Sequence, residues 1–172
     1  NGNGSITSTV QANTTAGFSI ITYTGTGSTA TIGHGLDAIP DWIIVKNRSA
    51  SQNWRVFHKD AYHGGGYRQY QSGIKLNSSA AADHGANSYW NNTAFTSNVF
   101  TIHTNSEVNV NSQNFVAYCF TSIQGYSKFG RYKGQENADG PFAYTGFAPA
   151  WIMIKQTDQS RDWLILDNTR EP

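Results

Sequence analysis

Apolar and polar residues alternate over short stretches of this chain, which is the pattern of half-buried β-strands. Glycine, asparagine and serine residues, which favour turns, separate these stretches. The only helix-like segment, residues 78–83, is long enough for a single turn at most. The chain is therefore predicted to be all-β, with strands within residues 17–24, 42–47, 54–57, 73–76, 98–104 and 114–123.

The last of these strands, NFVAYCFTSI, is apolar on both of its faces. One face carries Phe115, Ala117, Cys119 and Ile123, and the other carries Val116, Tyr118 and Phe120. A strand of this kind either lies in the centre of a sheet that is covered on both sides, or uses its outer face in assembly.

A β-hairpin is predicted at Trp42–Asp60, where two apolar runs flank a polar loop at residues 48–53. The hairpin pattern returns at Trp151–Asn168. Its landmarks recur at a constant offset of 109 residues: Pro40, Trp42, Lys46 and Trp54 correspond to Pro149, Trp151, Lys155 and Trp163. A fixed offset of this kind indicates a duplicated structural unit.

Many short strands with almost no helix predict an antiparallel β-sandwich or jelly roll. We expect a linker or arm at 1–16, a first sandwich repeat at 17–124, and the start of a second, truncated repeat at 125–172. The chain lacks an initial methionine, and we expect it to be a segment of a longer polypeptide. The predicted core comprises Phe18, Ile20, Ile43, Val45, Val56, Phe100, Ile102, Phe115, Ala117 and Cys119.

Charged residues make up only 13% of the chain and the net charge is +1, so no nucleic-acid-binding surface is predicted. No apolar run of about 18 residues is present, and no membrane insertion is expected. Cys119 is the single cysteine, and its apolar setting predicts a buried, inert thiol. A neutral, polar surface is typical of extracellular and virion proteins.

The acidic residues do not form a clear catalytic pair. Asp37 and Asp41 have a spacing that glycosidases use, but they straddle Pro40 in a turn. His58, Asp60 and His63 could ligate a metal, although a solvated strand end explains them better. The glycines at 64–66 lack the Lys-Ser/Thr of a phosphate loop. We therefore predict no catalytic residue, no metal site and no cofactor.

The best candidate for a ligand site is a glycan platform at Tyr89, Trp90, Asn91 and Asn92. An aromatic face can stack on sugar C–H groups, and asparagine amides can pair with hydroxyls. The alternative is that Trp90 packs in the structure. The matched tryptophans are predicted to pack: Trp42 and Trp151 in the core or between sheets, and Trp54 and Trp163 between repeats or subunits. Lys46, Asn47 and Arg48 are expected to satisfy loop backbone and solvent.

Three groups of motifs resemble a known family: TIGHGL followed by IPDWIIVKNRS, then VNVNSQNFVAYCF, and then GYSKFGRYKG with PAWIMIKQTD. From about Gly17 onward the chain is similar to a repeat domain in tail-fibre and other virion-surface proteins of tailed bacteriophages, especially phages of marine bacteria. The resemblance implies a jelly roll of the concanavalin-A-like lectin/glucanase type. It also implies a structural or receptor-binding role outside the cell, and it supplies no catalytic residue.

We therefore expect a non-enzymatic structural and adhesive protein on the virion surface, as a tail fibre or other appendage. The expected partners are other copies of the chain (a trimer, by analogy with fibres), other virion proteins, and a host-surface glycan or receptor. One alternative is a capsid decoration or fibre protein without a receptor of its own. The other alternative, from a different class, is a polysaccharide hydrolase.

Overall fold

The computed structural model describes residues 1–62, 69–85 and 87–170. Within these ranges the regular structure is β-sheet, apart from the single-turn 3-10 helix η1 (Gln69–Gln71). The strand pairs of its sheets are antiparallel, so the prediction of an all-β antiparallel sandwich is confirmed. Residues 78–83 form no helix. No helix in the described part of the chain is long and apolar enough to span a membrane.

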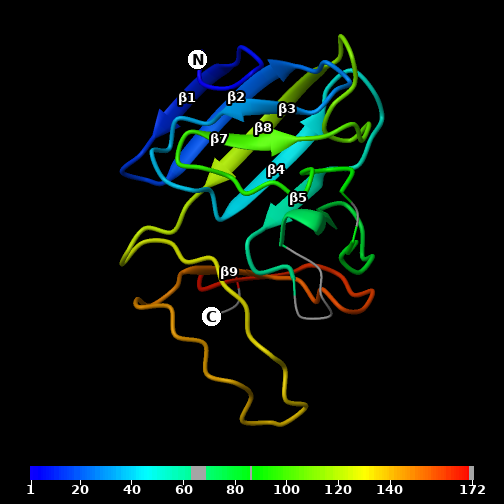
Figure 1. Ribbon diagram of the computed structural model, residues 1–172. Coiled ribbons are helices and arrows are strands. Elements are labelled where there is room, and N and C mark those ends of the chain that lie inside the picture. Colours follow the sequence, from blue (N-terminus) through cyan, green and yellow to red (C-terminus); the bar gives the residue numbers. More distant parts are fainter. Residues whose placement is uncertain (63–68, 86, 171–172) are drawn as a thin grey trace.

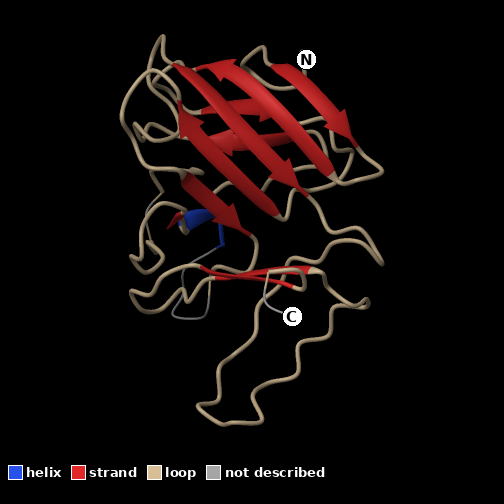
Figure 2. Ribbon diagram, turned by 180° about the vertical axis from the view of Figure 1, so that it is seen from behind, coloured by secondary structure: helices blue, strands red, loops and turns tan. Residues whose placement is uncertain are grey.

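The sandwich consists of one large and one small sheet (Figure 1). The large sheet, seen from behind in Figure 2, has six strands. Their spatial order is β1 (Thr9–Asn13), β2 (Phe18–Thr24), β8 (Asn114–Phe120), β4 (Trp42–Asn47), β5 (Arg55–His58) and β6 (Ile74–Lys75). The small sheet pairs β3 (Ala30–Gly33) with β7 (Val99–Ile102), and lies across one face of the large sheet. A separate hairpin pairs β9 (Trp151–Ile154) with β10 (Leu164–Asp167).

Strand β8 is the central strand that its sequence predicts, because it pairs with β2 on one edge and with β4 on the other. Its inner face, Phe115, Ala117 and Cys119, is fully buried. The Phe115 ring stacks on Tyr23 with the ring centroids 5.1 Å apart. The Tyr23 hydroxyl in turn donates a hydrogen bond to the Val108 carbonyl at 2.7 Å, so the buried phenol keeps a polar partner.

The predicted core is confirmed except at β2, where Phe18 and Ile20 face outward and Ile20 is 38% exposed. Ile21 and Tyr23 occupy the core in their place. Two adjacent isoleucines make both faces of this strand apolar, so the pattern alone could not choose the inner one. The pairing with β8 decides it, since Ile21 lies opposite the buried Ala117. Val56 is buried as predicted, but in a smaller cluster with Ile44, Ala61 and Ile74.

The structure also corrects the prediction of a linker or arm at 1–16. Residues Thr9–Asn13 form β1, which pairs with β2 along its whole length. Ile6 is buried in the core, and Val10 packs against it. Isolated apolar residues in a polar sequence are thus enough to anchor an edge strand, whose other face stays in solvent.

The two predicted hairpins have the same register at the 109-residue offset. Ile43 lies opposite Phe57, and Ile152 lies opposite Leu166. Lys46 Nζ donates to the Gln52 carbonyl, and the corresponding Lys155 Nζ donates to the Arg161 carbonyl at 2.8 Å. The repeat is therefore structural at the level of the hairpin and its loop.

The register of β2 predicts losses of stability of different size for two neighbouring isoleucines. Ile21→Ala should lower the free energy of unfolding by about 2–5 kcal/mol because it leaves a cavity in the core. Ile20→Ala should cost less than about 1 kcal/mol because its side chain faces solvent in part. Urea denaturation of the two variants beside the parent chain measures both values. Equal losses, or a larger loss for Ile20→Ala, would show that β2 is in the other register.

Candidate functional site

The predicted glycan platform is not exposed. Trp90 is fully buried, and its indole N–H donates to the Ser72 carbonyl at 2.9 Å. Its ring packs edge-on against Phe57 and Phe95. Tyr89 is buried as well, and neither ring offers a face to a ligand. Trp90 thus follows the packing alternative, which corrects the platform as a stacking surface.

Asn91 and Asn92, the polar part of that platform, form the turn that follows the buried tryptophan. Both adopt left-handed backbone conformations, with φ of 54° and 48°. Asparagine tolerates this region better than most residues. Their positions are therefore explained by the turn that carries the chain from Trp90 towards β7.

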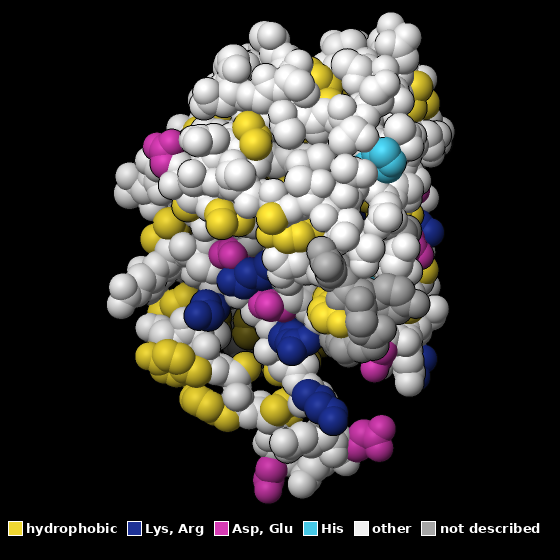
Figure 3. All heavy atoms as spheres, viewed as in Figure 1, with side chains coloured by type: hydrophobic (Ala, Val, Ile, Leu, Met, Phe, Trp, Pro, Cys, Tyr) yellow, Lys and Arg dark blue, Asp and Glu magenta, His cyan; other side chains and the backbone are white. Residues whose placement is uncertain are grey.

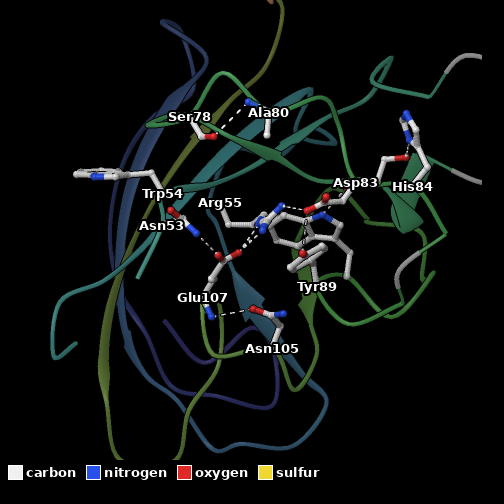
Figure 4. Close-up of polar contacts among 12 residues, drawn as sticks. Asn53, Trp54, Arg55, Ser78, Ala80, Asp83, His84, Tyr89, Asn105 and Glu107 are labelled. Atoms are coloured by element: carbon white, nitrogen blue, oxygen red, sulfur yellow. Dashed lines mark hydrogen bonds and ion pairs between the residues drawn. The ribbon is translucent and has the colours of Figure 1, made fainter. Parts of the chain in front are cut away.

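A buried arginine forms the most densely connected polar cluster (Figure 4). Arg55 lies on the inner face of β5 and is 1% exposed. Its Nε donates to Glu107 Oε2 at 2.5 Å, and its Nη2 also pairs with this carboxylate. Its Nη1 donates to Asp83 Oδ2 at 2.9 Å. One guanidinium therefore joins two carboxylates that lie 24 residues apart in the sequence.

The surroundings of Arg55 are built to hold it. The guanidinium carbon lies 3.9 Å from the centroid of the Tyr89 ring, a cation–π geometry. The Tyr89 hydroxyl donates to Asp83 Oδ2 at 3.1 Å. Gly73 gives the arginine room, since a Cβ there would lie 3.0 Å from its Cδ and Nη1 atoms. Every strong polar group of the cluster thus has a specific partner.

The charges in this cluster favour a structural role. Burial alone would raise the pKa of Asp83, but the hydrogen bond and the charge of Arg55 outweigh it and lower the pKa below the ordinary value. Burial raises the pKa of Tyr89 to about 12. Asp83 is therefore ionised at neutral pH, whereas a glycosidase acid needs a raised pKa. The sequence does contain a signal for this cluster, because an arginine at an inward-facing strand position requires a buried acidic partner.

Asp41 and His58, two of the other acidic and histidine candidates, are also held by structural contacts. Asp41 accepts hydrogen bonds from the Ser122 N–H and hydroxyl at 2.7 and 2.6 Å, and pairs with Lys59 Nζ at 2.9 Å. His58 Nδ1 accepts from the Asp60 N–H at 3.1 Å. His63 and the glycines at 64–66 lie outside the described residues. Among the residues that the structure does describe, no group of three or more His, Cys, Asp or Glu side chains could hold a metal ion.

An open aromatic groove lies on the outer face of the large sheet. It has a volume of about 540 Å³. The Phe120 ring at its centre lies 4.8 Å from Phe18 and 5.1 Å from Trp42, centroid to centroid. The apolar outer face of β8 is the sequence signal for this surface. The groove is lined by Ala16, Gly17, Phe18, Ile44, Trp54, Tyr118, Phe120, Thr121, Tyr126, Ser127 and Phe129.

The matched tryptophans are divided between this face and the second hairpin. Trp42 is half-buried on the outer face, where its ring lies 5.7 Å from that of Phe129. Trp163 packs on the first repeat and donates to the Lys75 carbonyl at 3.1 Å, which confirms packing between repeats. Trp151 is 53% exposed, so the predicted core position is wrong for it.

The opposite face of the sandwich, seen in Figure 3, is mostly neither hydrophobic nor charged. Charged side chains gather in the lower half of that view, near the second hairpin. The low charge that the composition predicts is thus visible over the sandwich.

A model of a family described as a domain of unknown function (DUF7483) matches residues 1–172. The chain belongs to the DUF7483 family. No curated protein and no solved structure gives a significant match. The function of this DUF7483 chain must therefore be argued from its fold and surfaces.

The Arg55 cluster predicts that removing one charge of the buried pair costs more stability than removing both. Arg55→Met should lower the free energy of unfolding by about 3–5 kcal/mol, because it leaves Glu107 buried without its counter-charge. The double variant Arg55→Met/Glu107→Leu should recover at least about half of that loss, because no unpaired buried charge remains. Chemical denaturation of Arg55→Met, of Glu107→Leu and of the double variant gives the coupling energy between the two residues. Strictly additive losses would contradict a direct buried ion pair.

One buried and one half-buried histidine, His34 and His58, predict that stability falls in mild acid. Burial lowers the pKa of His34 and of His58 below the ordinary value. Protonation of His34 would also remove the Nδ1 acceptor of the Leu36 N–H, a 3.2 Å hydrogen bond. The two histidines therefore bind protons more strongly in the unfolded chain than in the folded one. The stability that comes from keeping them neutral is fully present above about pH 6.5, and it declines as the pH falls below that value.

Urea denaturation at a series of pH values between about 7 and 5 measures this decline. His34→Gln should be less stable at neutral pH but lose less stability on acidification than the parent chain. A parental slope in His34→Gln would exclude His34 as a source of the decline.

Proposed function

We propose that this DUF7483 chain is a non-enzymatic structural and adhesive module of a virion surface appendage, such as a tail fibre. Its ligand, a host-surface glycan or receptor, is held in the aromatic groove on the outer face of the large sheet. The observation that carries the proposal is this groove, formed by side chains of β2, β4 and β8 with the segment that follows β8.

The groove has the chemistry of a recognition surface. Its volume of about 540 Å³ lies within the ordinary range for small-ligand sites, which are mostly apolar with a few polar groups. Phe18, Trp54 and Phe120 line it with aromatic rings, and Tyr118 and Tyr126 add rings that carry hydroxyls. Aromatic faces can pack on the C–H groups of a sugar while hydroxyls fix its orientation.

The composition of the surface agrees with a function outside the cell. Charged residues are 13% of the chain and the net charge is +1, which leaves a neutral polar exterior. The resemblance to tail-fibre repeat domains supports the same location on the virion surface. By analogy with fibres, we propose that copies of the chain associate as a homo-oligomer, a trimer, and contact other virion proteins.

The rival function of a polysaccharide hydrolase needs two carboxyl groups that flank a substrate. Asp83 and Glu107 are brought together, but both are ion-paired to the buried Arg55. Neither residue lines the outer groove. The observed geometry therefore favours the binding function over this rival.

The groove predicts which aromatic residues a ligand needs. On a glycan array and on host-surface polysaccharides, Tyr126→Ala should weaken binding at least about tenfold, because Tyr126 lines the groove and is 66% exposed. Tyr144→Ala is the matched control, since Tyr144 is 76% exposed and lies outside the groove. Dissociation constants from biolayer interferometry, with circular dichroism as a folding check, measure the difference.

Equal binding by the two variants would place the ligand site elsewhere. Absence of binding to every host-surface component would instead favour a decoration or fibre protein without its own receptor. New reducing ends that appear on incubation with polysaccharide would support the hydrolase and contradict the proposal.

A further inference from the structure

One side of the outer groove is formed by the segment that follows β8, residues 121–129, which we call the groove wall. The wall contains a tight turn, in which the Ser127 N–H donates to the Ile123 carbonyl at 2.9 Å. That turn shapes the wall but does not fix its position against the sheet. The wall contributes four residues to the lining of the groove: Thr121, Tyr126, Ser127 and Phe129.

A single carboxylate ties this wall to the sheet. Asp41 lies directly before β4, and its Oδ2 accepts hydrogen bonds from the Ser122 N–H at 2.7 Å and the Ser122 hydroxyl at 2.6 Å. The Ser122 Oγ in turn accepts the Phe129 N–H at 3.2 Å. Hydrogen bonds to an ionised acceptor are roughly twice as strong as neutral ones. Asp41 and Ser122 thus form a relay that reaches both ends of the wall.

The carboxylate of Asp41 is fully engaged and ionised. Its Oδ1 pairs with Lys59 Nζ at 2.9 Å, on the side away from the relay oxygen. Burial alone would raise the pKa of Asp41, but the hydrogen bonds from Ser122 and Lys59 outweigh it and lower the pKa below the ordinary value. At neutral pH the relay therefore ends on a negative charge.

The relay positions an aromatic ring of the groove. The Phe129 ring lies 5.7 Å from that of Trp42 and 6.1 Å from that of Phe120, centroid to centroid. Neither Asp41 nor Ser122 lines the groove. Both residues can therefore act on a ligand only through the wall that they hold.

The second repeat shows that this carboxylate is not needed to form the hairpin. Ala150 stands at the position of Asp41 at the 109-residue offset. The backbone contact is nevertheless the same in both hairpins. The Lys59 N–H donates to the Asp41 carbonyl at 2.9 Å, and the Asn168 N–H donates to the Ala150 carbonyl at 3.1 Å. The side chain of Asp41 therefore serves the contact with the wall rather than the hairpin.

We propose that Asp41 is a positioning residue of the aromatic groove, which holds the groove wall through Ser122 in the conformation that binds a ligand. The inference rests on the proposed function, because it takes the groove as the ligand site. A wall that is ordered in advance lowers the entropic cost of binding. The affinity of the groove is thus set in part by a side chain that lies outside it.

Hydrogen exchange of the whole 172-residue chain, followed by NMR, tests whether Asp41 holds the wall. In Asp41→Asn the Ser122 and Phe129 amides should exchange at least about tenfold faster, because the asparagine NH₂ group replaces one of the two acceptor oxygens. The slow amides of β8, which report global unfolding, should change less. Asp37→Asn, with the same change of charge at an exposed position, is the matched control and should keep the parental rates.

Binding of N-phenyl-1-naphthylamine, an uncharged aromatic dye that fluoresces in apolar sites, measures the groove itself. Asp41→Asn and Ser122→Ala should each raise its dissociation constant at least about fivefold, and the two effects should not add, because both break the same relay. Tyr126→Ala should weaken dye binding as well, because Tyr126 lines the groove. Neither measurement uses a glycan, so both decide the role of Asp41 independently of the glycan array.

Parental exchange rates at Ser122 and Phe129 in Asp41→Asn would overturn the proposal, as would parental dye affinity in both relay variants. An equal increase in exchange across β8 and the wall would also overturn it, because Asp41 would then act on the whole fold. The same loss of dye binding in Asp37→Asn would assign the effect to net charge instead.

Discussion

The pairing of β8 with both β2 and β4 is the interaction on which the rest of the structure depends. β8 is apolar on both faces, so its inner side chains form the core and its outer side chains form the aromatic groove. The six-stranded sheet is continuous only because this strand joins its two halves, β1–β2 and β4–β5–β6. In the second repeat the hairpin β9–β10 forms a sheet of its own, and residues 127–133, which correspond to β2 at the offset, form no strand.

The buried Arg55 places a second constraint on the first repeat. It ties β5 to Asp83 and Glu107, which lie on loops far from each other in the sequence. Its position on the inner face of β5 corresponds to Leu164 in the second hairpin. The ion-pair cluster therefore belongs to the first repeat alone, and the two copies share a hairpin register but differ in what fills the space beneath it.

Much of the fold could be predicted because it follows from local pattern. The hairpin at Trp42, the central position of β8 and the duplicated register are all encoded by alternation and by a fixed offset. Ile20 and Ile21 show the limit, since two adjacent apolar residues leave the inward face undetermined until a neighbouring strand sets the register. The edge strand β1 could not be predicted, because Val10 and the small Ala12 are its only apolar residues and give too weak a pattern.

The candidate site was harder to predict than the fold, for a physical reason. Trp90 stands among polar residues in the sequence, and only tertiary packing shows that its ring is enclosed by Phe57 and Phe95. The outer groove combines side chains that lie more than 100 residues apart, such as Phe18 and Phe129. Sequence reasoning identified an apolar outer face on β8, but it could not show which distant residues complete that surface.

Amide hydrogen exchange of the native chain tests most directly whether β8 organises the fold. The account predicts that amides of β8 exchange only through global unfolding and are the slowest in the protein. The amides of β9 and β10 should exchange faster by orders of magnitude, because a two-stranded hairpin is only marginally stable by itself. Equal protection of β8 and β9 would contradict the account.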